Sequence, residues 1–142
     1  MAKATTLSNA AVQAEGDALA ALLNNGYLRI YSGSQPATAD TAIGAQVLLA
    51  ELRFGATAAG ATSTGGVITF NAITSDTDAK ATNTAAWFRA LKSDGSTGVF
   101  DGTADVSGNS PNLVLSTTSI VQHATVSCSS FTHTIAKTTS GS

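Results

Sequence analysis

The chain has few charged residues for its length. Only 11% of its 142 residues are Asp, Glu, Lys or Arg, whereas a soluble domain typically has about 25%. Seven basic residues against nine acidic ones give a net charge of −2, so no basic stripe is available to neutralise phosphates. We therefore expect no nucleic acid partner, and a surface that is polar but weakly charged.

Cysteine and long apolar runs are almost absent as well. The one cysteine, Cys128, cannot form a disulfide within the chain and cannot build a zinc site without help. No run of about 18 apolar residues occurs, and residues 1–16 lack the apolar core of a signal peptide. The sequence therefore predicts no membrane partner, synthesis in a cytoplasm, and stability that comes from packing.

Apolar residues at helical spacing occur near the start of the chain. Between Thr6 and Asn25 they form a stripe made of Leu7, Ala11, Ala14, Ala18 and Leu22, widened by Val12, Leu19 and Leu23. Ser8 or Thr6 can cap the first turn, and Asn24-Asn25-Gly26 supplies the left-handed residue that ends many helices. The pattern predicts one amphipathic helix, which Gly16 weakens by about 1 kcal/mol relative to Ala, so that it needs a surface to lie on.

After Gly26 the apolar residues alternate with polar ones. Clusters of Gly, Ser and Asp divide this part of the chain into about seven short segments, which we predict as strands at residues 27–31, 47–54, 67–70, 85–92, 97–103, 112–115 and 124–135. Such a series is typical of an antiparallel β-sandwich or jelly roll. The predicted fold class is therefore all-β, with one N-terminal amphipathic helix.

The expected domain organisation follows from this change of pattern. Residues 1–26 form an N-terminal arm and helix, residues 27–136 the β-sandwich domain, and residues 137–142 a C-terminal tail. Within the domain, residues 55–66 contain only Gly, Ala, Thr and Ser. This low complexity predicts a flexible loop.

The clearest predicted element is a hairpin over residues 84–103. Asp94-Gly95 is a strong turn signal between its two strands. On the first strand Trp87 and Phe88 point to opposite faces, and both faces are apolar. We therefore expect this strand to be central, with Phe88 in the core.

The segment over residues 113–135 holds the chain's reactive side chains, Cys128, His123 and His133. Val126 shares its parity with Cys128, whereas Phe131 and His133 have the opposite parity, so a bulge or bend is expected around residues 129–130. No cation lies nearby in the sequence to lower the pKa of the thiol. We interpret Cys128 as a small buried apolar residue, His123 as part of a turn, and His133 as a residue near a strand end.

Other candidate sites are also better explained by structure. Asp76 and Asp78 could share a calcium ion, but the EF-hand spacing is missing, and turn-forming aspartates are more common. Trp87, Tyr27 and Tyr31 could stack on a sugar, although aromatic residues within a strand more often belong to the core. No nucleophile elbow, phosphate loop or positioned pair of titratable groups is visible. We expect no enzyme activity, no catalytic residue, no cofactor and no metal.

Four stretches of the sequence carry a resemblance to a known family. They are Tyr-Ser-Gly-Ser-Gln-Pro at 31–36, Leu-Leu-Ala-Glu-Leu-Arg-Phe at 48–54, the Trp-Phe-Arg hairpin with its Asp-Gly turns at 87–103, and Thr-Ser-Ile-Val at 118–121. Together they resemble small structural proteins of tailed-bacteriophage and prophage virions over nearly the whole chain after the helix. The resemblance implies a β-sandwich virion component, made in the host bacterial cytoplasm, with no catalytic pattern to carry over.

Within a virion we favour a capsid cement or decoration protein that bridges neighbouring capsomers. The expected partners are the major capsid protein and copies of the chain itself, as a dimer or trimer on the capsid surface, and the helix over residues 6–25 is the expected attachment arm. The alternatives are a tail or head-tail accessory subunit and a carbohydrate-binding host-recognition domain, as in a fibre or adhesin. The number of copies per particle distinguishes these alternatives, because a cement protein is present in nearly as many copies as the major capsid protein.

Overall fold

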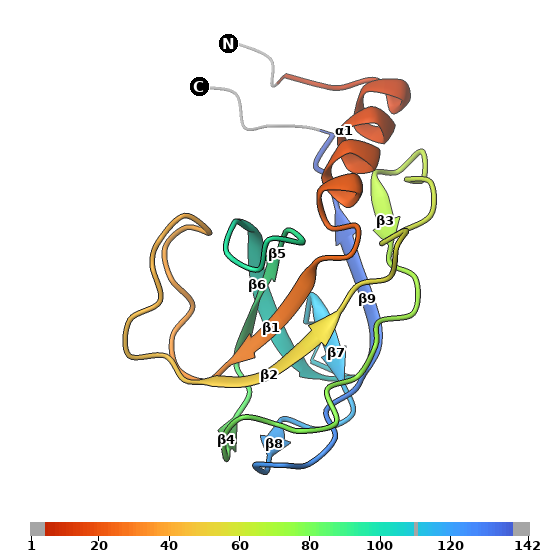
Figure 1. The fold of residues 1–142 in the computed structure, drawn as a ribbon. Coiled ribbons are helices and arrows are strands. Elements are labelled where there is room, and N and C mark those ends of the chain that lie inside the picture. Colours follow the sequence, from red (N-terminus) through yellow and green to blue (C-terminus); the bar gives the residue numbers. More distant parts are fainter. Residues whose placement is uncertain (1–4, 110, 138–142) are drawn as a thin grey trace.

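The computed structural model describes residues 5–109 and 111–137 (Figure 1). Within these residues one helix, α1 (Asn9–Leu22), precedes nine strands. Seven strands form one sheet in the order β2-β1-β5-β6-β7-β9-β3. Their bounds are β1 (Tyr27–Tyr31), β2 (Leu48–Arg53), β3 (Val67–Thr69), β5 (Trp87–Leu91), β6 (Gly98–Val106), β7 (Leu113–Leu115) and β9 (Cys128–Thr134). The other two, β4 (Asn83–Thr84) and β8 (Ser119–Ile120), form a separate antiparallel ribbon.

The sheet is mixed, whereas the sequence predicts a purely antiparallel one. β6 and β7 are parallel, and every other neighbouring pair in the sheet is antiparallel. Alternating polarity reveals which face a residue takes, but it does not reveal the direction of the neighbouring strand. The β-rich fold and the helix are as predicted. The prediction that all strands are antiparallel is wrong for one pair, β6 and β7, which are parallel.

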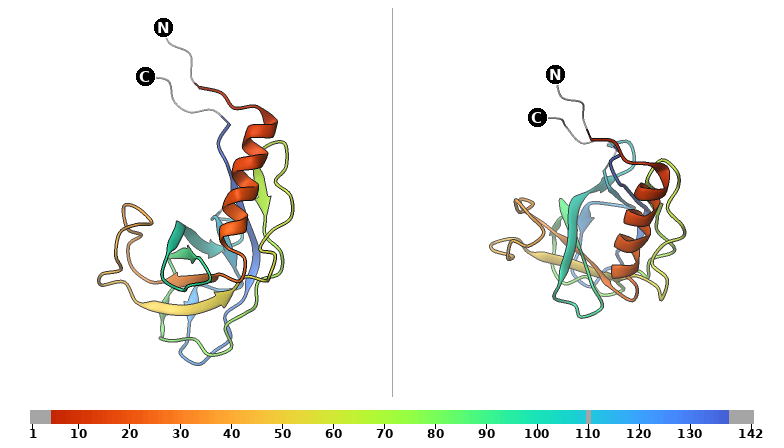
Figure 2. Two further views of the ribbon diagram at one scale, coloured as in Figure 1. Left: turned by 45° about the horizontal axis from the view of Figure 1, so that its top comes forward. Right: turned by 90° about the horizontal axis from the view of Figure 1, so that it is seen from above.

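Residues 70–80, which we call the closing segment, link β2 at one edge of the sheet to the chain just before β9. On one side, the backbones of Thr74 and Arg53 exchange hydrogen bonds of 2.9 and 3.1 Å. On the other side, Asp76 and Val126 exchange hydrogen bonds of 3.0 and 2.7 Å just before β9. In Figure 1 this green segment descends beside β9. These bridges bring the β2 side of the sheet round toward β9, so the sheet is rolled (Figure 2). The described strands form one mixed sheet that does not clearly match the predicted sandwich or jelly roll.

All five phenylalanines of the chain meet inside this rolled sheet. The Phe131 ring lies at the centre, with ring centroids 4.5 to 6.1 Å from the other four, which are Phe54, Phe70, Phe88 and Phe100. Such aromatic pairs stabilise a core beyond their buried area. β5 is buried on both faces, which confirms the prediction that it is central and that Phe88 belongs to the core.

The predicted bulge in β9 is also confirmed. Val114 of β7 pairs with Ser130, whereas the next residue, Leu115, pairs with Cys128, so Ser129 is the extra residue. Because of this shift, Cys128 and Phe131 both pack against the core in spite of their opposite parity.

α1 lies along one side of the rolled sheet, beside β3 and β9 (Figures 1 and 2). Ser8 caps it by accepting a hydrogen bond from the Ala11 amide at 3.0 Å, and Asn25 takes the left-handed conformation after its end. The buried stripe is Val12, Gly16, Ala20 and Leu23. Val12 and Leu23 belong to the predicted apolar face, whereas Ala14, Ala18 and Leu22 of its predicted centre are exposed.

The helix therefore belongs to the core and is not a free arm, so removing it would uncover apolar side chains of the sheet domain. Residues 1–4 of the expected arm and residues 138–142 of the expected tail at 137–142 lie outside the described residues, whereas the carbonyl of Lys137 accepts a hydrogen bond of 2.8 Å from the Leu7 amide. In the part of the chain that is described, no helix is both long and apolar enough to cross a membrane.

Candidate functional surface

The outer face of the sheet carries a covered aromatic pair where β1 and β5 lie side by side. The rings of Tyr31 and Trp87 stack with centroids 4.6 Å apart and planes 14° from parallel. The Trp87 indole also donates a hydrogen bond of 3.3 Å to the carbonyl of Ser32. Trp87 and Tyr31 are only 1% and 5% exposed.

Residues 32–47 connect β1 to β2, and we call them the β1–β2 loop. In Figure 1 the loop stands out from the sheet as the orange segment on the left. Its base is closed by a hydrogen bond of 3.0 Å from the Ser32 amide to the Val47 carbonyl. Higher up, the Gln46 side chain ties the two arms together, because its amide nitrogen donates to the Ser34 carbonyl at 2.7 Å and its oxygen accepts from the Gly44 amide at 2.9 Å.

The tip of the loop is held by Arg89, a buried cation on β5. The Arg89 guanidinium forms a two-pronged ion pair with Asp101 of β6 at 2.7 and 2.9 Å. Its Nη1 and Nη2 groups also donate hydrogen bonds of 2.8 and 3.3 Å to the carbonyls of Thr41 and Thr38. The hydrogen bonds with Asp101 raise the pKa of Arg89 above its ordinary value, although burial opposes this effect. Arg89 is therefore a permanent cation that links the sheet to the loop.

The loop presents an almost uncharged surface. Asp40 is its one charged residue, and Ile43 and Val47 are 37% and 41% exposed. Between the arms lies an open hollow of about 370 Å³ lined by uncharged residues, which are Gly33, Ser34, Pro36, Thr41, Ala42, Gly44, Ala45 and Gln46. This combination suits contact with another protein, because few charges need to be desolvated.

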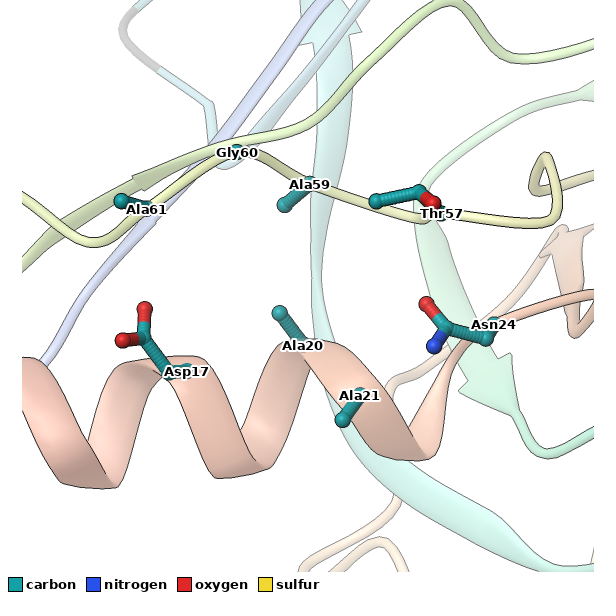
Figure 3. Close-up of a pocket in the computed structure, with 8 residues that line it drawn as sticks. All are labelled: Asp17, Ala20, Ala21, Asn24, Thr57, Ala59, Gly60 and Ala61. Carbon is teal, nitrogen blue, oxygen red and sulfur yellow. The ribbon is translucent and has the colours of Figure 1, made fainter.

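A second hollow lies between α1 and residues 57–61 (Figure 3). Four of its eight lining residues are alanines, and polar side chains stand at either end. The Asp17 carboxylate accepts a hydrogen bond of 2.8 Å from the Thr62 amide, which holds the pKa of Asp17 below its ordinary value. The Asn24 side chain accepts one of 2.9 Å from the Ala58 amide. These groups hold residues 55–66 against the helix, so the predicted loop is irregular but anchored.

Of the reactive side chains singled out in the sequence, Cys128 and His133 lie half-buried beside the core. Burial raises the pKa of the Cys128 thiol to about 11 and lowers the pKa of His133, whose ring lies 4.7 Å from that of Phe100. A third hollow, of about 220 Å³, opens beside Cys128 where the closing segment and β9 separate. A thiol with this pKa is not a nucleophile at neutral pH.

The two aspartates offered as calcium ligands take part in turns, as predicted. Asp76 is buried and accepts hydrogen bonds of 2.8 Å from the amides of Glu51 and Asp78. The exposed Asp78 carboxylate lies 2.6 Å from Nδ1 of His123, which occupies the predicted turn with φ of 70°. Over residues 5–109 and 111–137, no three His, Cys, Asp or Glu side chains gather as a metal site would require.

The structure separates the three aromatic residues offered as a sugar platform. Trp87 and Tyr31 are buried and stack on each other. Tyr27 lies nearer the surface, with the guanidinium of Arg53 4.0 Å above its ring. Two of the three rings are therefore inaccessible to a sugar.

Sequence reasoning did not single out the β1–β2 loop as a site. A signal was available, since a long segment with one charge and no alternating pattern separates two clear strands. The contact between Arg89 and the loop joins residues about fifty positions apart, and no local pattern reveals such a contact.

Comparison with known proteins adds nothing to this picture. No family model, curated protein or solved structure matches the chain.

Proposed function

We propose that this chain is a structural protein of a tailed-bacteriophage virion, and that it acts as a capsid cement or decoration protein between neighbouring capsomers. The observation that carries the proposal is the β1–β2 loop, a projection with a single charged residue, Asp40, that is fixed to the sheet by Arg89 and Trp87. A cement protein packs in many copies against the major capsid protein, where each buried charge would add a desolvation cost. The resemblance of four sequence stretches to virion proteins supports the same assignment.

The carbohydrate-binding alternative finds less support. An adhesin needs aromatic faces open to solvent, and here Trp87 and Tyr31 are buried. A tail or head-tail accessory subunit would use the same kind of uncharged surface as a cement protein. The place and the number of copies in the particle distinguish these two assignments.

Particles assembled with and without the chain test the proposal. We expect electron cryomicroscopy to show added density over the whole shell, and quantitative mass spectrometry to give a copy number close to that of the major capsid protein. Supplying the wild-type protein to deficient particles should restore the density and their resistance to heat. Density confined to the connector or tail, or a copy number of a few to tens, would contradict the cement assignment.

A further inference from the structure

The chain turns from α1 into β1 at residues 23–26, which we call the corner. The corner contains Asn25, the only asparagine of the sequence that a glycine follows directly. In such a pair the backbone nitrogen of the glycine can attack the side-chain carbonyl carbon of the asparagine, because glycine has no side chain that hinders the approach. Asn25 is exposed, and its backbone is left-handed with φ of 58°. Water therefore reaches its side chain, and the backbone of the corner decides whether the two groups meet.

Hydrogen bonds hold both polar atoms of the peptide group between Asn25 and Gly26. Its carbonyl oxygen accepts a hydrogen bond of 2.9 Å from Nη2 of Arg53, and its N–H group donates one of 2.7 Å to the carbonyl of Leu23. The attack requires this peptide group to rotate about the Cα–C bond of Asn25 and to lose its N–H proton. Both hydrogen bonds must therefore break before the nitrogen can react with the side chain.

The packing around Gly26 restrains the same peptide group. Gly26 is buried, and a Cβ at this position would lie 2.2 Å from the carbonyl oxygen of Leu91 on β5. Its carbonyl accepts hydrogen bonds of 3.0 Å from the Phe54 amide and of 3.3 Å from Nε of Arg53. The Arg53 guanidinium is itself held 4.0 Å above the ring of Tyr27. The peptide group can therefore rotate only when the corner separates from the sheet.

We propose that Asn25 is a site of spontaneous deamidation, which the folded corner blocks and which local opening of the corner releases. In the open corner the Gly26 nitrogen gives its proton to hydroxide and forms a bond to Cγ of Asn25. The bond from Cγ to Nδ2 breaks, ammonia leaves, and a cyclic succinimide remains. Water then opens the ring at either carbonyl, which gives aspartate or isoaspartate. This site is independent of the cement assignment.

The modification changes how α1 can pack. Isoaspartate adds a methylene group to the backbone at the position where the left-handed Asn25 ends the helix and leads into β1. Val12 and Leu23 on the buried face of the helix have no exposed surface, so a displaced helix uncovers apolar side chains. A chain that forms isoaspartate while its corner is open therefore cannot restore the same corner, and the modification records that the helix has opened.

Peptide mapping by mass spectrometry measures deamidation at Asn25 in the purified full-length protein at pH 8, with and without urea. The native protein should react at least about tenfold more slowly than the protein in urea, because its rate is proportional to the fraction of molecules with an open corner. The product should be a mixture of aspartate and isoaspartate at this position. Native protein that reacts as fast as the unfolded chain would overturn the block, and the absence of reaction in urea would overturn the site itself.

Arg53→Met tests the hydrogen bonds that hold the corner. This change removes both donors of Arg53, so native deamidation should accelerate at least about tenfold, while the rate in urea stays at the wild-type value. Arg29→Met is the matched control, because the Arg29 guanidinium also lies beside the Tyr27 ring, 5.6 Å from its centroid, but donates to Glu51 and not to the corner. The control should deamidate like the wild type under both conditions.

Amide exchange in β9 shows whether the variant opens locally or unfolds as a whole. Exchange there should be the same in Arg53→Met and in the wild type, because β9 does not contact Arg53 through any hydrogen bond described above. Faster exchange in β9 together with faster deamidation would overturn local opening as the cause. Equal native rates of deamidation in Arg53→Met and the wild type would overturn the role of Arg53.

Discussion

Cys128 shows how burial controls chemistry at the scale of one residue. Its pKa of about 11 leaves almost no thiolate at pH 8. We expect a thiol reagent to label the native protein at least about a hundredfold more slowly than the protein in denaturant, where the pKa returns to about 8.5. A disulfide reagent whose thiol leaving group absorbs light gives the labelling rate under each condition, and the two rates give the ratio.

A neighbouring position provides the control for this labelling experiment. Ser129 is the extra residue of the bulge and is exposed, so Ser129→Cys combined with Cys128→Ser should label rapidly in the native state. Equal labelling rates at positions 128 and 129 would show that the bulge does not direct Cys128 toward the core.

His133 makes stability depend on pH. Burial lowers its pKa in the folded state, so the unfolded chain binds a proton more readily than the folded one. The stabilisation from neutral His133 is fully present above its unfolded pKa of about 6.5 and is lost as pH falls through the lower folded value.

Urea unfolding of the wild type and of His133→Asn at pH 7.5 and pH 5.5 measures this dependence. The asparagine variant removes the titration, so the wild type should lose more free energy of unfolding between the two values than the variant does. Parallel losses in both proteins would count against a buried neutral His133.

At the scale of the element, a close contact determines which face of α1 packs against residues 55–66. A Cβ on Gly16 would lie 2.3 Å from the Thr62 hydroxyl oxygen, so Gly16→Val should destabilise the protein by about 1–3 kcal/mol through overpacking. Ala14→Val, on the exposed face of the same helix, should cost only about 0.5 kcal/mol. Thermal unfolding of the two variants compares these positions, and equal losses would mean that Gly16 does not face residues 55–66.

The elements themselves can be predicted well from local patterns. Alternating polarity predicts β1 with its observed bounds, and the change of parity between Val126 and Phe131 predicts the bulge in β9. Which face of α1 is buried could not be predicted, because the helix turns its small Gly16 toward the anchored loop and leaves Leu22 exposed. Which face of the helix is buried depends on its contacts with residues 55–66, which are distant in sequence.

The same limit explains what the sequence does not reveal about the candidate surface. Parity places Trp87 and Arg89 on one face of their strand, but it does not reveal that both donate hydrogen bonds to carbonyls of the β1–β2 loop. The closing segment is likewise hidden, because it pairs through isolated bridges such as Arg53 to Thr74 and leaves no alternating pattern. Local periodicity identifies strands, whereas sheet closure and loop docking depend on contacts between distant residues.

At the scale of the whole molecule, low charge predicts how attachment responds to salt. At about 1 M salt the Debye length falls to about 3 Å, which would release a protein held by exposed ion pairs. If the chain is a cement protein, as proposed, we expect it to stay on the capsid at this salt concentration, because apolar contacts do not weaken under these conditions. Pelleting particles at low and high salt and measuring the bound fraction tests this, with release by salt alone as the contrary result.

The rolled sheet also has a consequence for how the chain folds as it is made. The β1–β2 and β5–β6 hairpins form from neighbouring residues, but β3 must wait for β9, since Val67 pairs with Thr134. Pairing across such a sequence distance is slow because loop closure costs entropy before contacts repay it. Until Arg53 pairs with Thr74 and β3 pairs with β9, the outer edges of β2 and β9 present unpaired backbone to other chains. While the chain is being made, aggregation therefore competes with these last pairings, and the risk ends once both edges are paired.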